Sequence, residues 1–225
     1  MATLLTAWTP EILTQVVGVP APGIIYAVRK AAIKFCEETL LWTLTLDRIS
    51  IVANTASYPL TVPVLEHGEV INIDNVKYKS AGADDDQFRR LDPISETQQD
   101  LIDSGSWSFL TSPQPNNYYS DYLNKQISFY QIPSVASASG LLVKVNLRPT
   151  IDTVDVPDFL YNDFKEDIKH GALENLFGAK AMAWYDIEKG MYHGAMFKNA
   201  YADGKQLRIS GPTKRPMQVR MRNWL

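Results

Sequence analysis

Hydrophobic and polar positions follow three successive patterns along the chain. Over residues 22–44, apolar side chains recur every three or four positions, the period of a helix with one buried face. From residue 45 to about 150, short alternating segments typical of half-buried strands lie between turn-forming residues. Over 157–204 the helical period returns. The order helix, strands, helices predicts an α+β fold.

The first predicted helix, residues 22–44, has Pro22 in its first turn, where a missing backbone N–H costs nothing. Its charged side chains fall mostly off the apolar stripe. The stripe consists of Ile25, Val28, Ala32, Phe35, Thr39 and Trp42.

The middle of the chain is expected to be antiparallel and rich in β-strands. We predict strands at 48–52, 69–79 (with a turn at 74–75) and 141–148, and a hairpin of 118–123 with 126–132. Loops are expected at 81–86 and 134–140. A short helix is predicted over 93–104, because Ser95 and Gln98 have the spacing of a capping box.

Two helices are predicted near the C-terminus, over 157–177 and 180–202, separated at Gly178. In the second, Trp184, Ile187, Met191 and Ala195 should share one face. We therefore expect a helical bundle built from N-terminal (1–44) and C-terminal (157–204) segments. An antiparallel β-rich subdomain (45–156) would be inserted between them, and an extended C-terminal tail (205–225) would follow.

Charge is distributed unevenly along the chain. The 225 residues carry a net charge of −3, and residues 205–225 carry six basic side chains and no acidic one, so the remaining 204 residues carry −9. A basic tail that ends in Asn223-Trp224-Leu225 suits docking to an acidic or grooved partner. A solvated terminus explains the same pattern equally well.

Candidate chemistry is sparse. His170 and His193 lie 23 residues apart on different predicted helices, without the i,i+3 or i,i+4 ligand spacing of a helical metal site. Cys36 lies beside the apolar stripe and is expected to be a buried, unreactive side chain; as the single cysteine it excludes an internal disulfide. The sequence thus predicts no catalytic residue, no cofactor and no metal site.

Other motifs give no stronger indication. The run 84–86 is acidic but lacks the spacing of a calcium loop, and there is no phosphate-binding glycine motif or GxSxG. Tyr118, Tyr119 and Tyr122 could stack on nucleic-acid bases, but packing across a hairpin is the simpler interpretation. No apolar run approaches the roughly 20 residues that span a bilayer, and no signal peptide is expected.

Several segments, taken in order, form one progression along the chain. The first, residues 28–42, reads VRKAAIKFCEETLLW, and the later ones are Leu147–Thr150, Val156–Leu160, Ile168–Leu176, Ala183–Tyr185 and Met196–Phe197. The first segment resembles the N-terminal helix of the head-to-tail adaptor (connector or neck) proteins of tailed bacteriophages, and the later segments resemble the C-terminal half of that family. The likeness spans about residues 20–205.

The resemblance implies a structural virion protein and not an enzyme. Such proteins form a ring, most often of twelve copies, between capsid and tail, after assembly in the host cytoplasm. The ring sits under the portal, extends the channel for double-stranded DNA and offers an attachment surface to the tail nozzle or tube. Acidic faces would let DNA slide without sequence-specific binding. No membrane partner is implied.

The resemblance also assigns roles to residues. Loops 81–87 and 112–117 become candidates for tail contact. The basic tail becomes the portal-docking candidate, with Arg208, Lys214, Arg215, Met217, Arg220, Arg222, Trp224 and Leu225. Packing within and between subunits is assigned to Phe35, Trp42, Phe177, Trp184, Met191 and Phe197.

Two alternatives stay open. The protein could be a stopper or tail-completion protein of the neck. It could also be a nucleic-acid-binding module that uses the basic tail, although the charge of the body argues against this.

Overall fold

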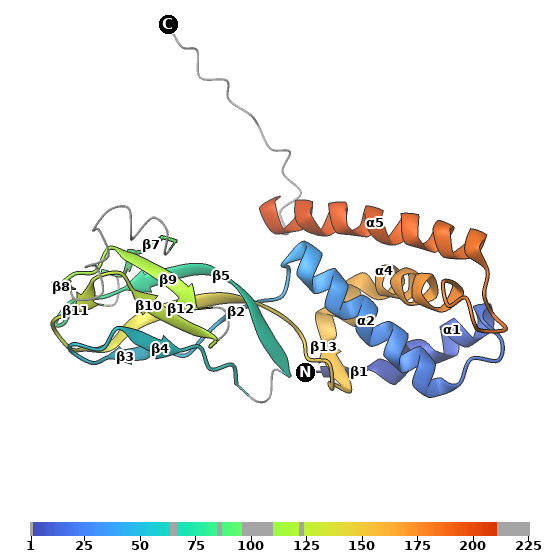
Figure 1. The fold of residues 1–225 in the computed structure, drawn as a ribbon, viewed down its shortest axis with the longest axis horizontal. Helices are drawn as coiled ribbons and strands as arrows, with labels where there is room; N and C mark the ends of the chain where they lie inside the picture. The colour runs from blue at the N-terminus through green and yellow to red at the C-terminus, as the bar shows by residue number, and fades with distance from the viewer. Residues whose placement is uncertain (1, 64–66, 85–86, 96–109, 122–123, 211–225) are drawn as a thin grey trace, which may run out of the picture. The chain divides into compact units, whose positions relative to one another are not determined.

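A computed structural model describes residues 2–63, 67–84, 87–95, 110–121 and 124–210. The chain forms two compact units. The helical unit comprises residues 1–41 and 148–225, and the β unit comprises 42–147 (Figure 1). Helices and antiparallel strands confirm the predicted α+β class.

The helical unit is built around three long helices that lie side by side (Figure 1). A short helical segment and a two-stranded ribbon at the N-terminus complete it. The helices are α1 (Thr9–Gln15), α2 (Ala21–Thr39), α4 (Asp158–Phe177) and α5 (Ile187–Ser210), the short segment is a 3-10 turn (Leu5–Trp8), and the ribbon pairs β1 (Ala2–Leu4) with β13 (Asp155–Pro157).

The N-terminal residues are fastened to the start of α4. Thr3 Oγ1 donates a hydrogen bond to Asp158 Oδ1 at 2.6 Å, and Trp8 Nε1 donates one to the Lys165 carbonyl at 3.0 Å. The Trp8 ring also meets Tyr161 edge to face, with centroids 4.8 Å apart. These contacts join residues more than 150 positions apart, so the two ends of the chain form one helical unit.

The β unit contains three sheets among its described residues. One has the order β2-β12-β5-β6, with β3 also paired to β12; a second has the order β4-β10-β9-β7; the third pairs β11 with β8 in parallel. The strands are β2 (Thr43–Thr45), β3 (Ile49–Ile51), β4 (Ser57–Pro59), β5 (Gly68–Tyr78), β6 (Arg89–Arg90), β7 (Asp92–Pro93), β8 (Thr111–Ser112), β9 (Asn117–Asp121), β10 (Gln126–Phe129), β11 (Ile132–Pro133) and β12 (Ser137–Pro149).

Alternation along β12 behaves as predicted, since Leu141, Val143, Val145 and Leu147 are fully buried. The predicted hairpin is also confirmed as β9 and β10, although residues 122–123 lie outside the described residues. Tyr118 is buried in it, opposite Phe129, as cross-strand packing requires. At the boundary of the unit, the Leu147 N–H donates to the Trp42 carbonyl at 2.8 Å.

Three boundaries in the β unit differ from the prediction. The predicted turn at 74–75 is wrong: β5 runs through it, because its neighbour β12 is longer still and pairs with it. The loop at 134–140 is partly wrong, since Ser137–Gly140 belongs to β12 and Gly140 approaches the Lys79 carbonyl too closely for a larger residue. Of the helix at 93–104, Pro93 lies in β7, and 96–104 lie outside the described residues.

Helix boundaries also differ in the helical unit. Helix α2 ends at Thr39, because Leu40 adopts a left-handed conformation (φ 53°) and its N–H bonds back to the Cys36 carbonyl. Helix α5 starts seven residues later than predicted, since the Asp186 carboxylate accepts a hydrogen bond from the Lys189 N–H and caps the helix. It then continues to Ser210.

Candidate interaction surfaces

Glycines bring the three long helices into close contact. An added Cβ at Gly171 of α4 would lie 2.5 Å from two ring atoms of Phe197, and one at Gly204 of α5 would lie 2.6 Å from the Thr39 methyl group. Because the two glycines have no side chain, the Phe197 ring of α5 packs directly on the backbone of α4, and Thr39 of α2 packs directly on the backbone of α5. The close fit fixes which face of α5 is left outside.

An aromatic cluster fills the space between these helices. Phe35 of α2 lies 4.9 Å from Phe164 and 6.4 Å from Phe197, measured between ring centroids, and Phe197 lies 4.6 Å from Tyr201. Cys36 is fully buried next to this cluster, as predicted, and burial raises the pKa of its thiol. A thiol in this state is a packing group and not a nucleophile.

The two histidines meet between α4 and α5. Their Nδ1 atoms are 2.7 Å apart, and the His193 ring stacks on Phe177 with centroids 5.7 Å apart. Such a hydrogen bond needs one Nδ1–H donor and one unprotonated Nδ1 acceptor, so at least one ring is neutral. Burial lowers the pKa of both imidazoles, and Lys169 lowers both further. The spacing of 23 residues gave no indication of this pair.

The described residues form no cluster of potential metal ligands. Within the described ranges there is no cluster of three or more histidine, cysteine or acidic side chains able to hold a metal ion. The same ranges contain no helix that is long and apolar enough to cross a bilayer.

The six predicted packing residues have different environments. Phe35, Phe177 and Phe197 are buried inside the helical unit, whereas Trp42 lies in the β unit beneath Gly68. Trp184 is half-buried in the turns before α5.

Met191, by contrast, is 70% exposed. Ile187 and Ala195, predicted to share a face with Met191, are exposed beside it, so this face is not packed within the helical unit. Packing between subunits stays a prediction for Met191. The buried face carries small residues that an apolar-stripe search overlooks: Gly190, Gly194, Ala200 and Gly204, beside His193, Phe197 and Tyr201.

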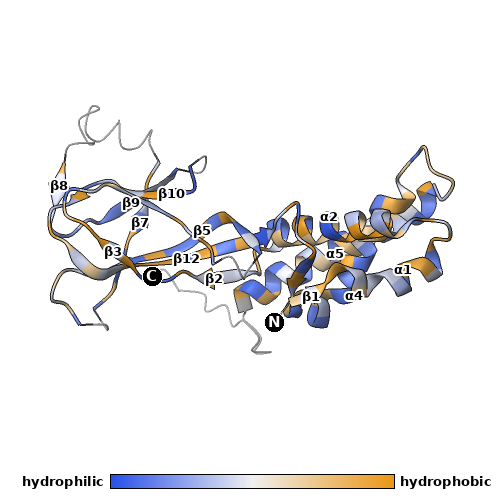
Figure 2. Cartoon of the chain, turned by 90° about the horizontal axis from the view of Figure 1, so that it is seen from below, coloured by the Kyte–Doolittle hydropathy of each residue, from blue (hydrophilic) through white to orange (hydrophobic). Residues whose placement is uncertain are grey.

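These exposed residues line an open groove between α2 and α5. We call it the lysine groove; it comprises Lys30, Lys34, Ile187, Met191, Ala195 and Lys198, with Glu174 and Asn175 of α4 at its base. Its three lysines form no ion pair with any described residue. Both hydrophobic and hydrophilic residues occur along every helix of the unit (Figure 2).

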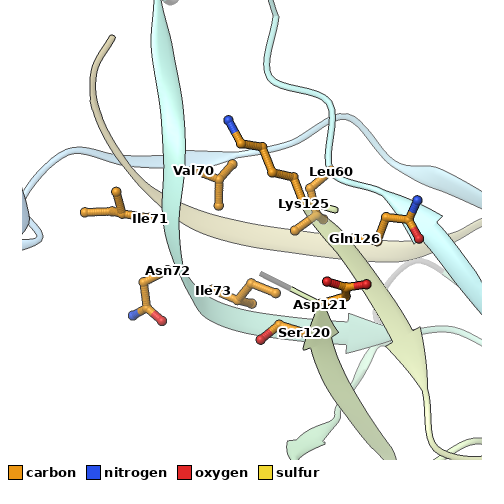
Figure 3. Close-up of a pocket in the computed structure, with 9 residues that line it drawn as sticks. All are labelled: Leu60, Val70, Ile71, Asn72, Ile73, Ser120, Asp121, Lys125 and Gln126. Atoms are coloured by element: carbon orange, nitrogen blue, oxygen red, sulfur yellow. The ribbon is translucent and has the colours of Figure 1, made fainter. Parts of the chain in front are cut away.

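The β unit has a small pocket of about 90 Å³ between β5 and the β9–β10 hairpin (Figure 3). Val70 and Ile73 of β5 line it with Leu60, and Asp121 and Lys125 lie at its opposite side. Lys125 is itself paired with Glu69 at 3.2 Å. The mixed lining can hold one small apolar side chain beside a charge.

Loop 112–117, predicted to contact the tail, is held in a defined conformation. Arg89 donates hydrogen bonds to the carbonyls of Gln114 and Pro115, and the Tyr78 hydroxyl donates to that of Pro113. The other predicted loop, 81–87, turns at Gly82, which has a positive φ of 75°. Residues 85–86 of that loop lie outside the described residues.

The C-terminal tail begins later than the sequence suggested. Residues 205–210 continue α5, so Lys205 and Arg208 are helical, and Lys205 pairs with Glu38 of α2 at 3.0 Å. The other portal-docking candidates, Lys214, Arg215, Met217, Arg220, Arg222, Trp224 and Leu225, lie outside the described residues.

Comparison with known proteins agrees with the resemblance read from the sequence. The sequence model of one family, described as SU10 adaptor protein, matches residues 2–220, nearly the whole chain. A search of curated proteins finds no match. The family is one of structural phage proteins and not of enzymes, and an adaptor role implies a place in the virion together with other head and tail proteins. The chain belongs to the SU10 adaptor protein family, a family of phage adaptor proteins.

Proposed function

We propose that this protein forms a ring in the neck of the virion, beneath the portal, where it lengthens the DNA channel and offers the attachment surface for the tail. The family match over residues 2–220 carries this proposal. A helical unit without a convergent catalytic or metal-binding group among its described residues supports a structural role. Assembly would take place in the host cytoplasm, and a ring of twelve copies suits the family resemblance.

The C-terminal tail is the portal-docking element in this proposal. It leaves the end of α5 after Ser210, and its remaining 15 residues can extend up to about 50 Å. Met217, Trp224 and Leu225 would enter apolar pockets of the portal. The arginines would meet acidic groups around them, since buried aromatic anchors with a charged rim dominate such interfaces.

The β unit is proposed to face the tail protein. Loop 112–117 is held by Arg89 and Tyr78, so it presents a preorganised surface and loses little conformational entropy on binding. The small pocket beside β5 could accept one apolar side chain of the partner. Double-stranded DNA would pass acidic walls without sequence-specific contacts, since residues 1–204 carry a net charge of −9.

Co-sedimentation with the purified portal of the same phage tests this function. Three forms are compared: the full chain, a deletion of residues 211–225 that keeps α5 intact, and a chain whose tail residues are scrambled. We expect only the full chain to sediment with the portal. Binding by the scrambled tail would show that charge alone suffices, whereas no binding by the full chain would refute the portal-proximal role.

The alternatives give different outcomes in the same set of experiments. A stopper or tail-completion protein would bind the purified tail protein and not the portal. A nucleic-acid-binding module would bind duplex DNA with an affinity that falls steeply with salt, and deletion of 211–225 would reduce that dependence.

A further inference from the structure

The two sides of helix α5 carry opposite charges around exposed apolar residues. On one side lies the lysine groove, whose lining includes two exposed apolar side chains: Met191, 70% exposed, and Ile187, 50% exposed. Residues 187, 191, 194–195 and 198 are three or four positions apart and therefore share this side of the helix. Lys30 and Lys34 of α2 form its far rim.

The other side of α5 faces away from α2. Tyr192, Met196 and Leu207 are exposed along it at helical spacing, and Asp203 lies between the last two. It lies beside α4, because the Tyr192 ring meets the His170 ring edge to face, with centroids 6.3 Å apart.

Asp163 lies four residues before Asp167 on α4, across a kink at Phe164. Leu160 and Ile168, on either side of the kink, are both fully buried, so α4 keeps the same buried face and Asp163 extends the negative charge of the outer side. We call this surface the acidic flank: Asp163, Asp167, Tyr192, Met196, Asp203 and Leu207. Asp163 and Asp203 are exposed and form no ion pair with any described residue.

We propose that the lysine groove of one copy binds the acidic flank of a second copy of this chain. The inference rests on the proposed ring and names the two surfaces that would build it. Lys34 and Lys198 of one copy would lie opposite Asp163 and Asp203 of the next. The apolar side chains of both surfaces would cover one another between these charges.

A second copy fits the groove better than nucleic acid does. Lysines alone would suit phosphates, but the groove also exposes Ile187 and Met191, which gain from being covered by apolar side chains. The acidic flank, on another side of the same helix, would repel DNA and offers the negative charge that the lysines need together with exposed apolar side chains.

The two surfaces are different patches of one chain, so their contact is heterologous. Each copy can use its groove for one neighbour and its flank for the other. Contacts of this kind form a ring when the rotations between successive copies close on the first copy, and an open filament when they do not. The geometry of α5 therefore accounts for a ring without a twofold axis between neighbouring copies.

Charge reversal provides a direct test with the full chain. Variant X carries Lys34→Glu and Lys198→Glu; variant Y carries Asp163→Lys and Asp203→Lys. In sedimentation velocity we expect each variant alone to self-associate at least about 100-fold more weakly than wild type, because like charges would face each other. Mixed X and Y should associate again in alternation, and a chain with all four changes should self-associate alone.

A matched control reverses Lys77 and Asp152, which are exposed, lie outside both surfaces and form no ion pair with any described residue. This control should associate like wild type. Failure of X and Y to restore association when mixed would overturn the proposal. Unchanged self-association of variant X alone would also overturn the proposal. This holds even if variant X binds a duplex DNA probe more weakly than wild type.

Zero-length carbodiimide cross-linking detects the contact even when it is short-lived. Mixed isotope-labelled and unlabelled chains should give intermolecular links between Lys34 or Lys198 and Asp163 or Asp203. The Lys205–Glu38 pair at 3.0 Å supplies the intramolecular positive control. Wild-type chains without such links or self-association would refute this inference alone, because portal co-sedimentation tests the proposed function separately.

Discussion

Gly171→Ala tests whether the helical unit depends on the close contact of α4 and α5. The new methyl group would lie 2.5 Å from the Phe197 Cε1 and Cζ atoms and 2.8 Å from Cδ1. Phe197 is 1% exposed and packed by Phe35 and Tyr201, so its ring cannot turn away without disturbing both. Forcing an extra methyl group into a packed core costs about 1–3 kcal/mol.

The higher helix propensity of alanine partly offsets this cost. Alanine is about 1 kcal/mol more favourable than glycine within a helix, so the net loss in free energy of unfolding should be about 0–2 kcal/mol. Urea denaturation followed by far-ultraviolet circular dichroism measures it, since the helices of the described residues lie in the helical unit.

Gly190→Ala is the matched control. An added Cβ there would meet its nearest atoms at 3.6 Å, an ordinary van der Waals distance, so only the propensity gain of about 1 kcal/mol should appear. Phe197→Leu in the Gly171→Ala background should cost less than Phe197→Leu alone, because the two changes share one contact. A Gly171→Ala protein as stable as the Gly190→Ala protein would refute the reasoning.

Three further predictions concern other groups of the helical unit. Burial depresses the pKa of His170 and His193, so at acidic pH the unfolded chain binds more protons than the folded one. The stability of the fold should therefore decline as the pH falls below about 6.5. Thermal unfolding measured from pH 7.5 to 5 should show this decline, and His170→Gln should make it shallower. Trp8→Phe removes the hydrogen bond to the Lys165 carbonyl and should lower the free energy of unfolding in urea by about 1 kcal/mol, whereas no change would contradict that contact. Cys36 should react with a thiol reagent only after unfolding, and fast reaction of the native chain would contradict its burial.

Long periodic elements of the fold were predictable because burial alone sets their pattern. Helix α4 and strand β12 each keep one buried side over many residues, and both lie where the sequence indicated. Helix α5 was misplaced for a definite reason. Its buried face consists largely of glycine and alanine, so tight backbone contact replaces the large apolar side chains on which the prediction depended.

The candidate surfaces were less predictable than the fold. Met191 was assigned to packing within or between subunits from the family resemblance; within one chain it is 70% exposed, because α5 buries the face that carries Phe197. The contact of His170 with His193 depends on the same buried face. A sequence pattern gives the faces of one helix, but which faces meet depends on how closely two helices approach.

The hydrogen bond from Leu147 to Trp42 has a consequence for how such proteins diversify. The chain enters and leaves the β unit at two adjacent, paired positions, while the N-terminal ribbon and α4 hold the helical unit together independently. An insert with neighbouring ends can be lengthened, replaced or lost without rerouting the remaining chain. The β unit can thus be exchanged as a whole. Its binding specificity can change while the helical unit stays the same.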